Sequence, residues 1–185
     1  FAPVAEDRPL RLPTLERSVL LARDTLGGTV ETVLAPSATT FGAADLGVAL
    51  APDRFNGFGS ADNRGSRLYG AWTVTGGGTA YDLLGLGERI DGLVSVAPSD
   101  LSLAYGQAVI EVPLPGLAGS WLDGGRLVLE ADTTHGTPDL GRSGSPAGLT
   151  ATTDETNLSA GLAVPLVRTR SQNLTARAGI DWQSR

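Results

Sequence analysis

Few residues of this chain have a type and spacing that could support catalysis. His135, in the segment THGTPD, is the single histidine, and a Ser-His-Asp triad could in principle use it as a general base. The nucleophile turn G-x-S-x-G is absent, because the segment GRSGSPAG does not match it. We therefore predict that His135 is a solvated loop residue and that the protein is not an enzyme.

Candidate cofactor and metal sites are equally weak. The segment TGGGT (75–79) lacks the Gly-Lys-Ser/Thr sequence of a phosphate-binding loop, so we interpret it as the flexible end of a strand. Asp154 and Glu155 lie beside a polar loop but lack the spaced partners of a calcium site. The chain has no cysteine, which excludes a disulfide framework and a Cys-ligated zinc site. We expect no catalytic residue, cofactor or metal.

Composition limits the remaining classes of function. The 185 residues are 41% hydrophobic and carry a net charge of −6, which fits one folded domain or slightly more. All 14 basic residues are arginines without a cluster in the sequence, which argues against a nucleic-acid partner. No run approaches the roughly 18 apolar residues of a membrane-spanning helix. The chain begins at Phe1 and has no methionine, so we expect a processed product or a segment of a longer protein.

The elements that would position any site fall into two groups. Phe1–Pro13 is proline-rich and is predicted to be extended, and a helix is predicted over Thr14–Leu26, with Thr14 as its N-cap and Gly27 as its stop. One helical stripe carries the apolar residues Leu15, Val19, Ala22 and Leu26. The next two predicted strands, Thr29–Leu34 and Asp45–Leu50, form a hairpin. Residues 1–52 are too few for an ample core of their own.

From Arg54 onward the pattern predicts strands only. Each candidate has roughly 9–11 residues, the length that a tilted strand needs to cross a bilayer and longer than usual in soluble sheets. The seven candidate strands are Arg54–Asp62, Arg67–Thr75, Glu88–Ala97, Ser102–Val112, Arg126–Thr134, Leu158–Leu166 and Leu174–Gln183. The long polar segment 136–156 is predicted to be the most mobile loop.

Most of these strands alternate between apolar and charged residues, which puts the two kinds on opposite faces. One face would carry Leu68, Trp72, Ile90, Val94, Leu127, Leu129, Ile180 and Trp182. The other face would carry Arg67, Arg89, Asp91, Arg126, Glu130, Asp132, Arg177 and Asp181. The charged face suits either the outside of a soluble sandwich or the water-filled lumen of a wide barrel. The pattern alone does not decide between the sandwich and the barrel.

Several segments together resemble a known family. DRPLRLPTLERSVLLARDTLGG and VLAPSATTFGAADLGVAL resemble the end of a POTRA domain in the outer-membrane transporters of two-partner secretion, the haemolysin activation and secretion family. Leu15-Glu16-Arg17 matches the family's helix motif, whereas Leu26 stands where the family usually has proline. DNRGSR, LLGLGERI, YGQAVIEVPLPGLAG and VPLVRTRSQNL resemble the barrel's hairpins and strand ends in the same order, with Glu88 where aspartate is commoner.

This resemblance implies a mainly β architecture. Residues 1–52 would be the C-terminal part of a periplasmic POTRA domain, and residues 53–185 the first seven or so strands of a transmembrane antiparallel β-barrel in the outer membrane of a Gram-negative bacterium. The charged set would then face the lumen and the apolar set the lipid, and the loop 136–156 would lie outside the cell. The remaining strands, an upstream POTRA domain and the plug helix would lie elsewhere in the protein.

The resemblance also implies a function in protein transport. Such a protein would secrete a partner exoprotein of the adhesin or haemolysin type through its pore, without ATP or a cofactor. Its partners would be the unfolded client in transit and outer-membrane lipid, with no nucleic acid. Two alternatives remain: a barrel-assembly protein of the same superfamily, and a soluble β-sandwich binding module. A sandwich would bury Leu127, Leu129 and Ile180 between two sheets, whereas the transporter would expose them on one curved sheet.

Overall fold

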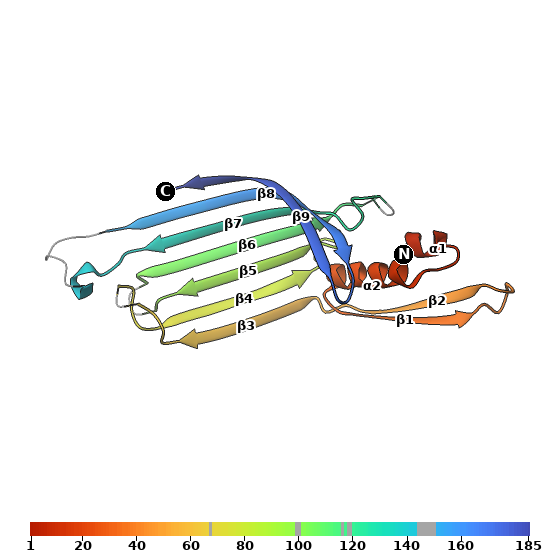
Figure 1. The fold of residues 1–185 in the computed structure, drawn as a ribbon. Helices are drawn as coiled ribbons and strands as arrows, with labels where there is room; N and C mark the ends of the chain where they lie inside the picture. The colour runs from red at the N-terminus through yellow and green to blue at the C-terminus, as the bar shows by residue number, and fades with distance from the viewer. Residues whose placement is uncertain (67, 99–100, 116, 118–119, 144–150) are drawn as a thin grey trace.

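The computed structural model describes residues 1–66, 68–98, 101–115, 117, 120–143 and 151–185. Its elements, in chain order, are α1 (Ala2–Glu6), α2 (Leu12–Leu26), β1 (Thr29–Pro36), β2 (Ala44–Ala51), β3 (Phe55–Asp62), β4 (Thr73–Tyr81), β5 (Arg89–Val96), β6 (Leu103–Pro113), β7 (Arg126–Gly136), the 3-10 turn Leu140–Ser143, β8 (Thr153–Arg168) and β9 (Asn173–Ser184). The fold is mainly β, and its strands form two antiparallel sheets (Figure 1).

The N-terminal part confirms the predicted helix and hairpin. Helix α2 ends at Gly27, whose backbone is left-handed (φ 63°) and whose N–H donates to the carbonyl of Arg23. The helix begins two residues earlier than expected, and Arg11 rather than Thr14 is its N-cap. The prediction of an extended start is wrong, because α1 forms there with a proline in its first turn, where proline suits a helix. Neither of the two described α-helices is long and apolar enough to cross a membrane.

The larger sheet contains seven strands in sequential order, β3-β4-β5-β6-β7-β8-β9, and each strand pairs antiparallel with the next (Figure 1). The sheet is open: β3 and β9 are its two edges, and they do not pair with each other. The number of strands agrees with the prediction. Strand β9, which runs along one edge, is exposed over its whole length.

One predicted strand is displaced. The alternation around Trp72 predicted a strand over Arg67–Thr75, but Arg67 lies outside the described residues, and strand β4 begins only at Thr73 and continues to Tyr81. The glycines of TGGGT, expected at a strand end, are therefore its centre. Leu68 lies in the preceding loop, not on the sheet. Close approach explains two of the three glycines: a Cβ at Gly77 would lie 2.8 Å from the backbone oxygen of Gly92 and 2.9 Å from the ring of Phe58, and a Cβ at Gly78 would lie 2.8 Å from the backbone oxygen of Asn56.

The ends of the polar segment 136–156 are also more regular than predicted. Strand β8 begins at Thr153 rather than Leu158, because its first residues pair with the end of β7, from Gly136↔Thr153 to Thr133↔Thr156. Residues 140–143 form a 3-10 turn. The prediction of mobility falls mainly on residues 144–150, which lie outside the described residues.

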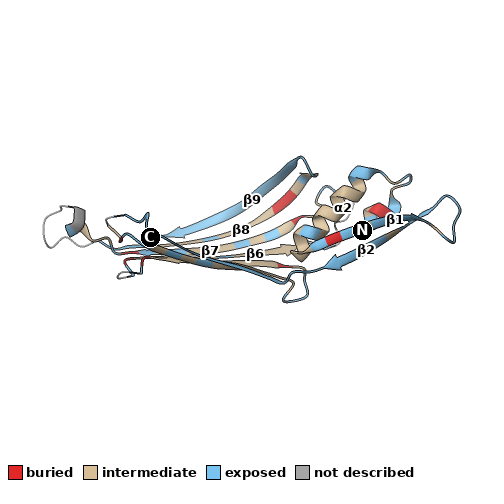
Figure 2. Cartoon of the chain, turned by 90° about the horizontal axis from the view of Figure 1, so that it is seen from below, coloured by how far each residue is buried: buried red, intermediate tan, exposed pale blue. Residues whose placement is uncertain are grey.

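The two faces of the large sheet differ in curvature and in covering. Figure 2 shows the sheet curving up at β8 and β9 toward the side that carries α2, so this side is concave. The strand register places those members of the apolar set that lie in strands on the other, convex side, where Leu127, Leu129 and Ile180 are 39%, 41% and 77% exposed. Leu68 and Trp72 lie in the loop before β4 and are not part of this face. Leu127, Leu129 and Ile180 are not enclosed between facing sheets, contrary to the expectation for a β-sandwich.

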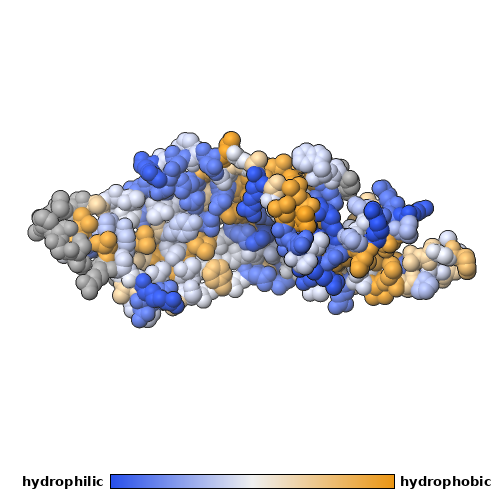
Figure 3. Space-filling view, viewed as in Figure 1, coloured by the Kyte–Doolittle hydropathy of each residue, from blue (hydrophilic) through white to orange (hydrophobic). Residues whose placement is uncertain are grey.

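The described residues bury few apolar side chains. The buried hydrophobic residues are Val4, Val30, Ala97, Ala163 and Val164, and they are scattered over α1, β1, β8 and a loop. Figure 3 shows the face that carries α2, where hydrophilic atoms cover much of the sheet and hydrophobic atoms form one patch near the middle of the view and another around the hairpin β1–β2. The apolar surface of the large sheet is therefore displayed outward rather than used as a core.

Candidate functional site: a charged cavity beneath α2

A charged cavity lies between the C-terminal half of α2 and the concave face of the large sheet. The cavity has a volume of about 660 Å³, with Leu20, Leu21 and Asp24 of the helix on one side and Arg126 and Arg177 of the sheet on the other. It lies at the end of the sheet where β4 ends and β5 begins, which is also the end that joins the hairpin β1–β2 (Figure 1).

The register of the strands explains why these charges meet. Arg89 of β5 lies opposite Glu111 of β6, and Arg126 of β7 is separated from Arg177 of β9 only by Ala163 of β8. Because side chains alternate with a period of two, directly opposed residues point to the same side of a sheet. Three strands that are distant in the sequence thus bring their arginines to one surface.

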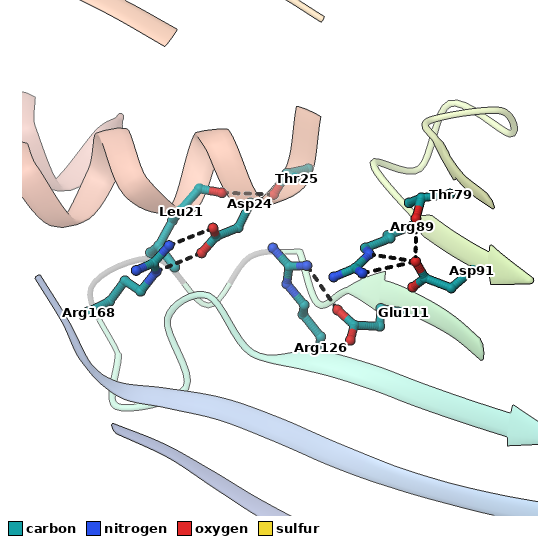
Figure 4. Close-up of polar contacts among 9 residues, drawn as sticks. All are labelled: Leu21, Asp24, Thr25, Thr79, Arg89, Asp91, Glu111, Arg126 and Arg168. Atoms are coloured by element: carbon teal, nitrogen blue, oxygen red, sulfur yellow. Dashed lines mark hydrogen bonds and ion pairs between the residues drawn. The ribbon is translucent and has the colours of Figure 1, made fainter. Parts of the chain in front are cut away.

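Two ion pairs cross this surface (Figure 4). Nη2 of Arg89 lies 2.9 Å from Oδ1 of Asp91, which also accepts a hydrogen bond of 2.6 Å from the hydroxyl of Thr79. Nη1 of Arg126 donates to Oε2 of Glu111 across 3.1 Å, and both side chains of this pair are less than one-fifth exposed. The partners hold the guanidinium groups in fixed directions beneath the helix.

The polar character continues along the concave face away from the cavity. The amide of Gln107 donates to Oε1 of Glu130 across 2.6 Å, and the amide of Asn157 donates to Oδ1 of Asp132 across 3.0 Å. Asp181 shares this face, since it lies opposite Ser159, which lies opposite Glu130. Every charge predicted for this face and described in the structure therefore lies on it. Arg67 is outside the described residues.

Helix α2 is fastened over the cavity by polar contacts that the sequence did not reveal. Arg168 at the end of β8 donates from Nε and Nη2 to the two oxygens of Asp24, across 2.8 and 2.7 Å. Nη2 of Arg17 donates to the carbonyl oxygens of Asp123 and Pro165, each across 2.8 Å. These contacts join residues more than one hundred positions apart, and no local pattern marks them.

The turn between β4 and β5 is organised by a buried carboxylate. Glu88 is fully buried, and its two side-chain oxygens accept hydrogen bonds from the backbone N–H groups of Leu84 (2.7 Å) and Leu86 (3.2 Å). The hydrogen bond from Leu84 is the main reason why the pKa of Glu88 lies below its ordinary value of 4.5, because backbone donors favour the charged form. This turn displays Leu83, Leu84 and Leu86 to the outside.

His135 is not a loop residue, contrary to the prediction. It lies in strand β7 on the convex side, and its Nδ1 is 2.6 Å from Oδ1 of Asp154 on β8. The histidine side chain is 50% exposed and that of Asp154 is 72% exposed. The pair forms because the last residues of β7 and the first of β8 continue the ladder into the predicted loop. Among the described residues, no group of three or more His, Cys, Asp or Glu side chains could hold a metal ion.

These features define a class of structure: an open, curved, seven-stranded antiparallel meander with a charged concave face, an apolar convex face and a helix over one end. Comparisons with protein-family models, curated proteins and solved structures find no match for this chain.

Proposed function

We propose that the chain forms part of an outer-membrane β-barrel that conducts an unfolded client protein across the membrane, as in two-partner secretion. The observation that carries this proposal is the distribution of residues over the two faces of one curved sheet. The convex face exposes Val94, Leu129 and Ile180, at 58%, 41% and 77%, whereas ion pairs line the concave face. Lipid favours the first surface, and a wet lumen favours the second.

The open edges agree with this proposal. Strands in a bilayer must satisfy their backbone hydrogen bonds within a closed barrel, because hydrocarbon offers no partners. Strands β3 and β9 each have one unpaired side, so further strands would complete the wall. We propose that residues 53–185 are one arc of that barrel and that residues 1–52, with the fold α-α-β-β, belong to a periplasmic POTRA domain next to it.

The geometry also suggests the course of a client. An extended chain would meet the hairpin β1–β2 first, since its edges and its exposed Val33 and Leu34 are available for β-augmentation. It would then pass beneath α2 and along the charged face, where Glu130 and Asp132 keep the path hydrated. No step of this route needs ATP or a cofactor.

A photocrosslinking experiment tests the proposal. A photoreactive residue is placed at Glu130 on the concave face and, as the matched control, at Leu129 on the convex face of the same strand. In cells making the natural protein, position 130 should capture a newly synthesised polypeptide that disappears as secretion is completed, and position 129 should not. Equal capture at both positions, or none at either while the protein is in the outer membrane, would refute the transport proposal.

A further inference from the structure

The cavity beneath α2 contains an excess of positive charge in a chain that is acidic as a whole. Five arginines line it, from α2, β5, β7, β8 and β9: Arg23, Arg89, Arg126, Arg168 and Arg177. The lining carboxylates are those of Asp24 and Glu111. The whole chain carries a net charge of −6, so this local concentration of arginines is opposite in sign to its surroundings.

Two of these arginines have no carboxylate partner within the described part of the chain. Arg168 is paired with Asp24, Arg126 with Glu111 and Arg89 with Asp91, which leaves Arg23 and Arg177. A guanidinium that is already paired with a carboxylate of the protein has few N–H donors available for a ligand. A guanidinium without such a partner keeps all its N–H donors available. The capacity to bind an anion is therefore concentrated at Arg23 and Arg177, on opposite walls of the cavity.

We propose that this cavity binds an acidic, extended polypeptide segment, with Arg23 and Arg177 holding carboxylates of its side chains. Guanidinium and carboxylate match in geometry and form paired, charge-assisted hydrogen bonds. This inference rests on the proposed function and narrows it in two ways. The client would make its first charged contact at the mouth of the barrel, and the client residues that make this contact would be glutamate or aspartate.

The dimensions of the cavity favour a polymer over a single small anion. Arg126 and Arg177 are separated by one strand, β8, which puts their backbones about 10 Å apart at the usual strand spacing. A volume of about 660 Å³ is in the range of pockets that enclose whole organic ligands rather than one ion.

The test uses two short fluorescent peptides that differ only in charge: one has glutamate at alternate positions, and the other has glutamine there. Binding to the complete barrel proposed above, purified in detergent micelles, is followed by fluorescence anisotropy at low salt. The acidic peptide should bind at least about tenfold more tightly, and the difference should shrink with added salt. Equal binding of the two peptides would overturn the proposal. Inorganic phosphate that displaces the peptide at equal concentration would overturn the preference for a polymer.

Substitutions locate the binding. The double variant R23Q/R177Q should bind the acidic peptide about tenfold more weakly, whereas R64Q/R185Q, which removes the same charge near the opposite end of the sheet, should leave binding unchanged. Equal losses in the two variants would show an effect of net charge alone and refute the site. A third variant, R23K/R177K, keeps the charge and should bind the acidic peptide more tightly than R23Q/R177Q. Equally weak binding of the acidic peptide by these two variants would also refute the arginine site.

Failure of this inference and failure of the proposed function give different results. Capture of a polypeptide in transit at position 130 without a preference for the acidic peptide would leave transport intact and reject the arginine site. A preference for the acidic peptide that depends on Arg23 and Arg177, without capture in transit, would leave the site intact and reject transport.

Discussion

An arginine placed on either face of β7 should reveal which face meets lipid. Leu129 and Val128 are neighbours in this strand and point to opposite sides. Leu129 lies between Ile110 and Ala160 on the convex face. Val128 lies on the concave face, opposite Glu111 of β6 and a glycine of β8. Leu129→Arg and Val128→Arg therefore introduce the same charge at nearly the same depth into two different environments.

The position of Leu129 in the strand sets the expected magnitude. Strand β7 has 11 residues, which extend about 34 Å, or about 26 Å across a membrane at the usual barrel tilt. This matches the apolar band of about 25 Å in outer-membrane barrels. Leu129 lies two residues from the central Ala131 and hence about 5 Å from the midplane. Arginine on the lipid face costs roughly 2–4 kcal/mol at the midplane and 0–1 kcal/mol near the interfaces, so we expect about 2 kcal/mol.

The assay is urea unfolding of the complete barrel proposed above, folded into lipid vesicles, with the free energy of unfolding measured for both variants. Leu129→Arg should lower it by about 2 kcal/mol. Val128→Arg should change it by less than about 0.5 kcal/mol, since its guanidinium stays hydrated beside Glu111. Equal effects of the two substitutions, or a larger effect at Val128, would refute the assignment of the faces.

Three further predictions concern the docking of helix α2, the turn between β4 and β5, and one close backbone contact at Gly28. A double-mutant cycle with Asp24→Asn and Arg168→Gln should give a coupling of about 1 kcal/mol in unfolding, because the pair is bidentate but partly exposed; a coupling near zero would mean that these residues do not hold α2. The lowered pKa of Glu88 means that the folded chain binds fewer protons than the unfolded chain below about pH 4.5. Stability should therefore fall as the pH drops below that value, and Glu88→Gln should flatten the slope in pH-dependent unfolding; an unchanged slope would contradict this role. Gly28→Ala should cost about 1–3 kcal/mol, because its Cβ would clash with the backbone at the end of β2, first with the carbonyl oxygen of Ala51. Gly59→Ala, with open space around it, should cost under about 0.5 kcal/mol; equal costs would argue against the clash.

The sequence predicted the strands well where side chains alternate and poorly where backbone contacts decide. Strands β5, β6 and β7 agree with the prediction to within about two residues at either end, because each carries charge on one face and aliphatic residues on the other. Strand β4 is the exception. The alternation around Trp72 lies in a loop and misplaced the prediction, whereas Gly76, Gly77 and Gly78 at the centre of the observed strand have a low intrinsic preference for strands. Pairing on both sides and the ring of Phe58 over Gly77 override that preference.

The candidate site was predictable only in part. The period of two was enough to predict that Arg89, Arg126 and Arg177 share a face, but no sequence pattern indicates that they lie close together beneath a helix. That placement depends on α2 docking through Arg17 and Arg168, whose partners are far away in the chain. Arg23 was not predicted at all, since on the helix alone it looks like a solvated side chain.

Fluorescence quenching along β7 shows whether the apolar convex face of the large sheet contacts lipid. The chain has no cysteine, so single cysteines at each position from Leu127 to Thr134 can carry one fluorophore each. In vesicles containing nitroxide-labelled lipids, we predict strong quenching at Leu127, Leu129 and Ala131 and weak quenching at the positions between them. A water-soluble quencher should give the opposite pattern. Uniform quenching along the strand, or no quenching by the lipids at Leu129, would contradict the account.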